Sequence, residues 1–204
     1  MIASLLSHTA RMPLLGGSSF KPSSSTPLWR DRPGAPPGPF FSEQLAAFAA
    51  SSGTIQRGPT CVLNSLSLLT LKEASPADIR ASPTGLNTQC PVSWSAALKP
   101  YGKKLAYCST DVRRLKHFAQ ELAELNDLFT ISYYCADPAG FTAEPNEEGW
   151  VCSSHIVVLA GKTIFDSANG NATDITSEQG LKAYGEAFVK RIFRVVPLGY
   201  PSEL

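Results

Sequence analysis

The spacing of the apolar residues changes near residue 127, and no other feature of the sequence constrains the fold as strongly. Before this point, apolar side chains recur at helical intervals in residues 61–71 and 112–125. After it, short runs of β-branched and aromatic residues predict strands at 128–134, 155–160, 163–166 and 192–196. Helices followed by an antiparallel sheet predict an α+β fold in which the first half of the chain packs on the second.

Turn and cap residues define further elements. Gly161-Lys162 predicts a tight hairpin between the second and third of these strands. We expect Thr110 or Asp111 to cap the helix that ends at residue 125, and Pro100 to end a short helix. That short helix is predicted at 92–98, with other helices at 42–50, begun by Ser42, and at 177–188, and a strand at 105–108.

The first 39 residues differ in composition from the rest of the chain. Seven of the 16 prolines lie before residue 40, and serines and glycines supply much of the remainder. Such a segment buries too little apolar surface to offset the entropy that it would lose on ordering. We therefore predict a disordered tail over residues 1–39 and a single folded domain over residues 40–204.

The tail and the cysteines bear on localisation. The tail has no acidic residue before Asp31, which is also the composition of an organellar transit peptide, and its apolar pieces are too short for a secretory signal. The chain has five scattered cysteines, an odd number in a chain too long to be a small disulfide scaffold. We expect mostly free thiols and an intracellular, reducing compartment.

The charge balance excludes some classes of partner. The chain has 18 basic and 17 acidic residues, so no overall field attracts nucleic acid. No apolar run approaches the roughly 18 residues that a membrane-spanning helix requires. The sequence leaves the oligomeric state open.

His155 is the best candidate for chemistry among the three histidines. His8 lies in the predicted tail, and His117 lies among basic side chains on the polar face of its helix. His155 begins a strand whose hairpin partner carries Asp166. A carboxylate that accepts a hydrogen bond from one imidazole nitrogen leaves the other nitrogen to take a proton from a nucleophile.

A cysteine nucleophile is expected at the start of a helix, because the positive end of the helix dipole favours a thiolate. Cys61 has this position. The side-chain amide of Gln56, together with the backbone N–H of Cys61, would form an oxyanion hole for a tetrahedral intermediate. Cys61, His155, Asp166 and Gln56 therefore predict a thiol acyl-transfer site.

Each of these residues also has an ordinary structural interpretation. A cysteine on an apolar helix is commonly core filler, and an Asp on a hairpin is commonly a solvated turn residue. Asn169 is an alternative to Asp166 as the third member of a triad. Cys152 and His155 have the spacing of two zinc ligands, but no second close pair accompanies them, so we expect no metal or other cofactor.

The order and spacing of these residues resemble the papain-like cysteine peptidases, in which a helix-borne cysteine faces a histidine and an Asp or Asn on a small antiparallel sheet. Gln56-x-Gly58-x-x-Cys61 resembles the oxyanion glutamine and nucleophile of Josephin-type deubiquitinases. Asp166-Ser167, after an aromatic residue, resembles their second motif. Cys61-Val62-Leu63-Asn64 is similar to the start of the catalytic helix in picornaviral leader proteases.

The resemblance covers residues 56–196. It implies a papain-like fold with Cys61 as nucleophile, His155 as general base, Asp166 as orienting acid and Gln56 as oxyanion donor. We predict a cysteine protease or isopeptidase that hydrolyses protein or peptide substrates through a thioester. A protein glutamine deamidase with the same site is an alternative, and so is a catalytically silent interaction module that keeps the papain fold.

The connection at residues 137–149 bears on the substrate. It contains Asp137, Glu144, Glu147 and Glu148, and Trp150 follows it. Connections of this length in a compact domain are often functional. We expect Trp150, Glu147 and Glu148 to border the cleft and to select a basic peptide, such as the Arg-bearing tail of a ubiquitin-like protein.

Overall fold

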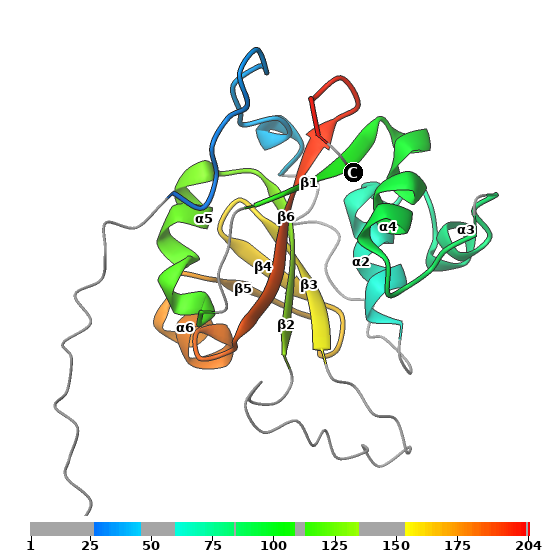
Figure 1. Cartoon of the computed structure of the whole chain (residues 1–204). Helices are drawn as coiled ribbons and strands as arrows, with labels where there is room; N and C mark the ends of the chain where they lie inside the picture. The colour runs from blue at the N-terminus through cyan, green and yellow to red at the C-terminus, as the bar shows by residue number, and fades with distance from the viewer. Residues whose placement is uncertain (1–26, 46–59, 84, 109–112, 135–153, 203) are drawn as a thin grey trace, which may run out of the picture.

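The computed structural model describes residues 27–45, 60–83, 85–108, 113–134, 154–202 and 204. Six antiparallel strands form one sheet in the order β1-β6-β2-β3-β4-β5 (Figure 1). They are β1 (Lys103–Tyr107), β2 (Leu128–Tyr134), β3 (Ser154–Ala160), β4 (Thr163–Asp166), β5 (Asn171–Asp174) and β6 (Val189–Pro197). With the helices that precede and follow these strands, the architecture is α+β, as predicted.

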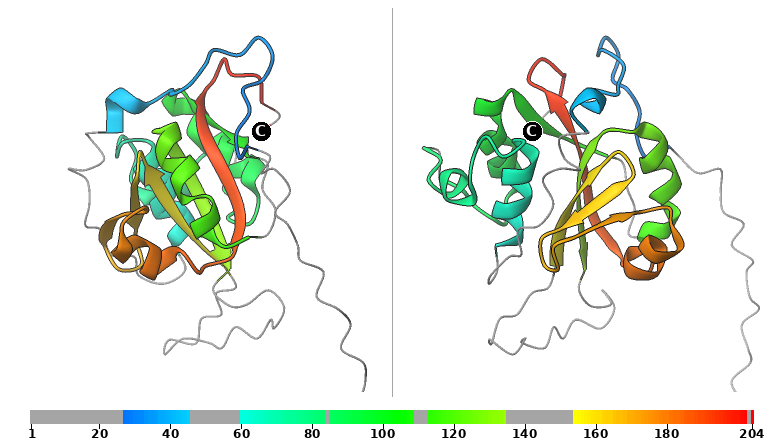
Figure 2. Two further views of the ribbon diagram at one scale, coloured as in Figure 1. Left: turned by 90° about the vertical axis from the view of Figure 1, so that its left-hand side faces the viewer. Right: turned by 180° about the vertical axis from the view of Figure 1, so that it is seen from behind.

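Helices lie on both sides of this sheet (Figure 2). The side named here the α2 side carries α2 (Cys61–Leu69), α3 (Pro76–Arg80) and α4 (Pro91–Leu98). The opposite side, named the α6 side, carries α5 (Ala119–Leu125) and α6 (Glu178–Tyr184). Short 3₁₀ turns form η1 (Ser42–Gln44), η2 (Lys99–Tyr101) and η3 (Leu115–His117).

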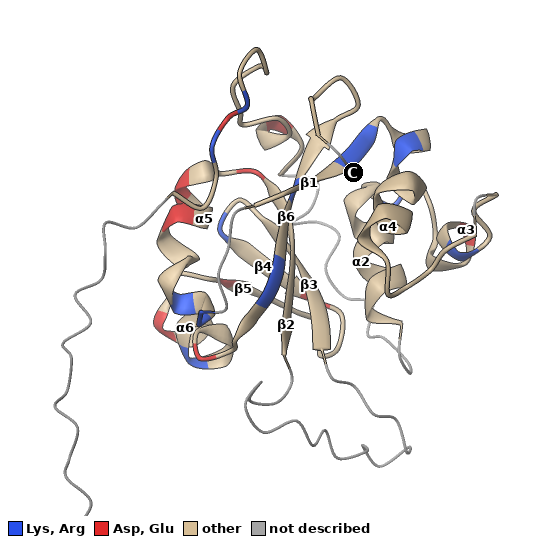
Figure 3. Cartoon of the chain, viewed as in Figure 1, with Lys and Arg blue, Asp and Glu red and all other residues tan. Residues whose placement is uncertain are grey.

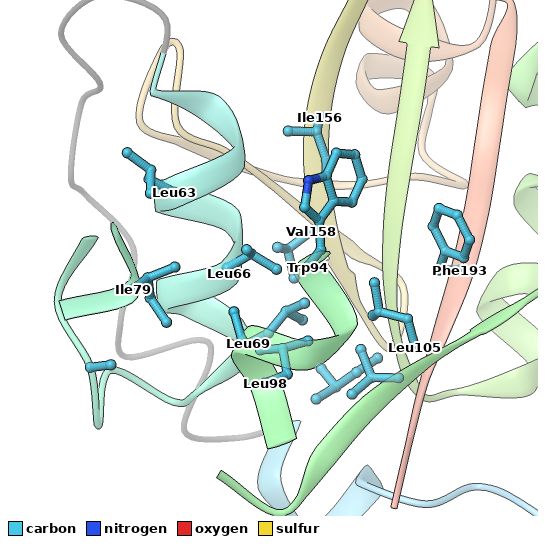
Figure 4. Packing of buried hydrophobic residues seen from close by; sticks show 14 of the residues in the cluster. Leu63, Leu66, Leu69, Ile79, Trp94, Leu98, Leu105, Ile156, Val158 and Phe193 are labelled. Carbon is cyan, nitrogen blue, oxygen red and sulfur yellow. The ribbon is translucent and has the colours of Figure 1, made fainter. Parts of the chain in front are cut away.

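Strand β3 contributes to the core on both sides, because successive side chains of a strand point to opposite faces. Ile156 and Val158 pack with Leu66 of α2 on the α2 side (Figure 4), whereas Val157 and Leu159 pack on the α6 side. A strand that is buried on both faces has a continuous apolar sequence, as β3 has. Complete burial of one leucine such as Leu66 contributes about 2 kcal/mol.

The strand predictions are largely confirmed. Strands β2 and β4 have the predicted bounds, the predicted strands at 155–160 and 192–196 lie within β3 and β6, and that at 105–108 overlaps β1. Gly161-Lys162 joins β3 to β4, with Gly161 at a φ of 60° that favours glycine. The sequence does not predict β5, because Asn, Ala and Asp have low strand propensity. The four residues of β5 form a strand because they pair with β4.

The helix predicted at 112–125 is wrong in its first half. Helix α5 begins only at Ala119, after η3. Arg114 instead pairs with Phe188 in an isolated bridge, and the N–H of Leu115 donates to the carbonyl of Ala187. These hydrogen bonds to a distant segment override the local apolar periodicity. The predicted caps Thr110 and Asp111 lie outside the described residues.

The other helix predictions differ from the structure mainly at their ends. Helix α4 begins one residue before the predicted 92–98, and α6 lies within 177–188, with Ser177 capping it by accepting from the N–H of Gly180 at 3.0 Å. Of the helix predicted at 42–50, only the 3₁₀ turn η1 and Leu45 are described, and Phe41 rather than Ser42 is its N-cap. The five-residue helix α3 is too short to show a periodic pattern.

Packed structure extends further toward the N-terminus than the boundary predicted at residue 40. Leu28 is buried on the α6 side, and its N–H donates to Glu121 at 2.5 Å. The ring of Trp29 lies 5.7 Å from that of Tyr200. Composition alone does not predict that Leu28 and Trp29 pack on the domain, because prolines, serines and glycines dominate residues 1–39. Residues 1–26 lie outside the described part of the chain.

A buried ion pair holds the segment before η1 against the sheet. Asp127 precedes β2 and accepts from Arg194 of β6 at 3.0 Å (Nε) and 2.8 Å (Nη2). The same carboxylate accepts from the backbone N–H of Phe40 at 2.8 Å and of Phe41 at 3.0 Å. The guanidinium also lies over the ring of Trp29, 4.8 Å from its centroid. Both charges are thus fully satisfied away from water.

Among the helices of the described residues, none combines the length and the apolar character that crossing a membrane requires.

Candidate functional site

Cys61 is the first residue of α2, where the sequence predicts it. The side chain of the N-cap residue Thr60 makes no capping hydrogen bond to a backbone N–H of the first turn and instead accepts from the side-chain amide of Asn64 at 3.2 Å. The orphan N–H groups at a helix start carry partial positive charge, and a thiolate placed there is stabilised. Cys61 is only half-buried, unlike Cys108, for which complete burial raises the thiol pKa to about 12. Cys61 therefore keeps part of its surface exposed to solvent.

The packing of α2 fixes Cys61 beside the start of β3. Leu66 and Leu69 of α2 are completely buried on the α2 side of the sheet. Ser65, one turn after Cys61, is buried and donates to the carbonyl of Ile156 at 3.3 Å. Ile156 is the residue after His155. One face of α2 thus carries the thiol at its first turn and a hydrogen bond to β3 at its second.

The side chains of His155 and Asp166 meet at the end of the β3–β4 hairpin. His155 Nε2 lies 2.7 Å from Asp166 Oδ1, and both side chains are less than a tenth exposed. The hairpin explains this contact, because Val158 pairs with Phe165, so the two side chains lie diagonally across neighbouring strands on one face. On β2, Tyr133 pairs with His155, and their rings pack edge to face at 5.5 Å. The predicted juxtaposition of His155 and Asp166 is present.

The Cys61 side chain also lies close enough to His155 to help raise the pKa of the imidazole. Since Nε2 faces Asp166, the nitrogen left for the thiol is Nδ1. The structure therefore brings Cys61, His155 and Asp166 into one chain of contacts, built from α2, β3 and β4. The imidazole stands between a carboxylate and a sulfur, as general-base chemistry on a thiol requires.

The surroundings of His155 favour its charged form. Burial by itself would lower the pKa of His155, but hydrogen bonds to Asp166 and Cys61 and the charges of both raise it to about 9. For Asp166, burial would raise the pKa, but the hydrogen bond and charge of His155 and further donors hold it below its usual range. The pair is thus an imidazolium next to a carboxylate near neutral pH.

The Asp166 carboxylate is held by four donors. Besides His155, it accepts from the N–H of Ala168 at 2.9 Å, from the hydroxyl of Tyr184 at 3.1 Å and from the side-chain amide of Asn169 at 3.5 Å. The two candidates for the third member of the triad thus have different contacts. Asp166 is the group that touches His155, and Asn169 is a donor to Asp166.

Tyr184 and Tyr133 belong to this site and were missed by sequence reasoning. Tyr184 comes from α6, is 5% exposed, and its ring lies 6.5 Å from that of Tyr133. Tyr133 packs against the imidazole of the pair, and Tyr184 donates to its carboxylate. No sequence signal distinguishes Tyr184, because it is one apolar position of a short helix 18 residues after Asp166.

Four predicted site residues lie outside the described residues: the oxyanion donor Gln56 and the substrate contacts Glu147, Glu148 and Trp150. The same holds for Cys152, half of the zinc-like pair with His155. Among the described residues, no three His, Cys, Asp or Glu side chains are grouped as a metal site would require.

Comparison of the chain with protein-family models, with curated proteins and with solved structures finds no match in any of the three.

Proposed function

We propose that this chain is a papain-like cysteine hydrolase that cleaves peptide or isopeptide bonds. One observation carries the proposal: Cys61, half-buried at a helix start, contacts a buried His155 whose other nitrogen is held by Asp166 at 2.7 Å. A core cysteine needs no such partner. The contact with His155 favours an active thiol over the catalytically silent module.

The first half of the reaction forms a thioester. The Cys61 thiolate attacks the carbonyl carbon of the scissile amide, and the carbonyl electron pair moves to oxygen, where the N–H of Cys61 and the amide of Gln56 would stabilise the negative charge. The tetrahedral intermediate collapses, the C–N bond breaks, and His155 donates its proton to the leaving amine. Asp166 keeps the imidazole oriented throughout.

The second half regenerates the thiol. Neutral His155 removes a proton from water as the water oxygen attacks the thioester carbonyl carbon. The C–S bond then breaks, which releases a carboxylic acid and returns the thiolate next to the imidazolium. The cycle consumes one water and needs no cofactor, but it needs a reduced Cys61. The proposal therefore places the protein in a reducing compartment.

Protein substrates remain the proposed class, with ubiquitin-like proteins among them, on the basis of the resemblance to deubiquitinases. Glu147, Glu148 and Trp150 stay proposed substrate contacts. Deamidation of a protein glutamine uses the same steps with ammonia as leaving group, so product analysis separates it from proteolysis.

Hydrolysis of peptide pools and of isopeptide-linked substrates tests the proposal, with mass spectrometry identifying every product. We expect cleavage that falls at least about a thousandfold in Cys61→Ala and His155→Ala, which lose the nucleophile and the base, and less in Asp166→Asn. Lys182→Gln, on the exposed face of α6, serves as the control and should cleave like the parent. Cleavage that persists in Cys61→Ala would contradict the proposal.

A further inference from the structure

The start of β6 breaks the regular alternation of side chains. β2 and β6 pair with Ser132 opposite Arg191 and Tyr133 opposite Val189, so Lys190 is an extra residue in the ladder. This arrangement is a β-bulge, and bulges commonly redirect a side chain. In a regular strand, Lys190 and Arg191 would point to opposite faces of the sheet.

The bulge places both cations on the α2 side. The ammonium of Lys190 lies 5.6 Å from the ring centroid of Tyr134 and donates to Ser154 Oγ at 3.3 Å. Tyr134 and Ser154 are paired residues at the same end of the sheet as His155. Arg191 shares its face with Phe193, which packs in the core of the α2 side. Two successive cations thus lie on the side where α2 presents Cys61.

These cations have no carboxylate partner among the described residues. Within the described residues, the ammonium of Lys190 interacts with Tyr134 and Ser154, and Arg191 has no ion pair or hydrogen bond. Other basic side chains of the described residues, such as Lys162 and Arg194, are paired with carboxylates. A guanidinium without a carboxylate partner can bind an anion through its fork of N–H donors.

The elements around these cations supply no anion. α2, α4, β1, β2, β3 and β6 contain no Asp or Glu at all, as the absence of red on them in Figure 3 shows. Two described acids on the α2 side are Glu73 and Asp78. Both follow the C-terminal end of α2, whereas Cys61 lies at its N-terminal end. Asp78 is engaged in the cap of α3 with Ser75. The anion must come from outside these elements.

We infer that Lys190 and Arg191, on the α2 side and at the end of the sheet that carries His155, form a subsite that binds a carboxylate of the substrate, so that the enzyme prefers peptides with Asp or Glu near the scissile bond. The inference rests on the proposed function and deepens it. It also opposes the expectation from the acidic connection at 137–149, which favours a basic peptide. A guanidinium can hold a carboxylate through two parallel hydrogen bonds, and the neighbouring ammonium adds a second positive charge.

Paired peptides test the subsite. Two peptide series differ only by Glu or Gln, placed in turn at each position on either side of the scissile bond. We expect one position at which kcat/KM is about tenfold higher for Glu, an advantage that falls as salt is raised. The advantage should disappear in Lys190→Gln/Arg191→Gln and persist in Lys190→Arg/Arg191→Lys. The control Arg80→Gln/Lys182→Gln removes the same charge from exposed positions and should keep it.

A second readout does not depend on peptide hydrolysis. Iodoacetate carries a carboxylate and iodoacetamide does not, while both alkylate the same thiolate, so their rate ratio at Cys61 reports the local positive charge. We expect the ratio of the iodoacetate rate to the iodoacetamide rate to fall severalfold in Lys190→Gln/Arg191→Gln and to stay unchanged in the control Arg80→Gln/Lys182→Gln. If no peptide is cleaved but the ratio falls, the proposed function fails and the anion subsite stands. Equal rates for Glu and Gln peptides, with an unchanged alkylation ratio, would overturn the subsite.

Discussion

Two buried ion pairs lie at opposite ends of β2, and their surroundings differ. Asp127 and Arg194, 2.8 Å apart, are enclosed by backbone N–H groups and aromatic rings, with the guanidinium 4.6 Å from the ring centroid of Phe40. Asp166 and His155, 2.7 Å apart, have a similar enclosure on one side, but the free face of the imidazole meets a half-buried thiol.

The difference separates a structural ion pair from one arranged for chemistry. The Arg194 pair satisfies every charge with fixed groups and joins three segments of the chain. In the His155 pair, a titratable group stands between a fixed carboxylate and a partner that can react. Burial and a short distance are common to both pairs, so these two properties do not identify a catalytic pair. The contact with a reactive thiol identifies it.

Removal of the guanidinium should give the largest effect on stability. Arg194→Met leaves Asp127 buried and without its charged partner, and we expect a loss of about 3–5 kcal/mol in the free energy of unfolding. Denaturant unfolding measures it. The double variant Asp127→Leu/Arg194→Met should recover part of the loss. In the folded fraction of Arg194→Met, Cys61 should react as in the parent. A loss of Cys61 reactivity there would contradict a purely structural role for the Arg194 pair.

The pH dependence of stability should distinguish the pairs. The His155 pKa is raised to about 9, so the stabilisation by its imidazolium is present below about pH 6.5 and lost as pH rises through about 9. The Asp166 pKa is lowered, so its contribution is present above about pH 4 and lost as pH falls through its folded pKa.

We therefore expect the parent to exceed His155→Gln in stability most between about pH 4 and 6.5, by on the order of 3 kcal/mol, and by little above pH 9. The deficit of Arg194→Met should stay constant over pH 6–9, because a guanidinium keeps its charge there. Unfolding titrations at a series of pH values measure both. A His155→Gln deficit that is independent of pH would show that the imidazole is not charged in the folded protein.

Tyr184→Phe should give the smallest effect. It removes the hydroxyl that donates to Asp166 Oδ2 at 3.1 Å, and we expect a loss of about 1 kcal/mol in stability. If Tyr184 positions Asp166, the variant should also shift the acidic limb of the pH–kcat profile to higher pH and leave KM nearly unchanged. NMR titration of the His155 ring provides a second check. An unchanged pH profile would make Tyr184 a packing residue only.

The sequence predicted the elements that carry the site better than the site itself. The β3–β4 hairpin and the start of α2 were predictable, because runs of β-branched and aromatic residues, a Gly-Lys turn and helical spacing are local signals. Tyr184 was not, since its contact with Asp166 depends on how α6 packs against the sheet. The bulge at Lys190 was equally hidden, because it exists only in the pairing of β6 with β2.

Local reasoning failed most clearly where distant segments decide the structure. The apolar spacing at 112–125 favours one long helix, but Arg114 pairs with Phe188 and the helix begins at Ala119. Leu28 lies in a proline-rich segment, and its burial follows from contacts with residues more than 90 positions away. Such contacts leave no periodic trace in the sequence.

The rate of Cys61 alkylation by iodoacetamide between pH 5 and 9, read by mass spectrometry, tests the central claim most directly. Cys90 is the matched internal control, because it also lies at a helix start, as the N-cap of α4, but has no histidine contact among the described residues. We predict that Cys61 reacts faster than Cys90 at pH 6 and that His155→Ala abolishes this difference. Equal rates for the two thiols, unaffected by His155→Ala, would contradict an active Cys61–His155 pair.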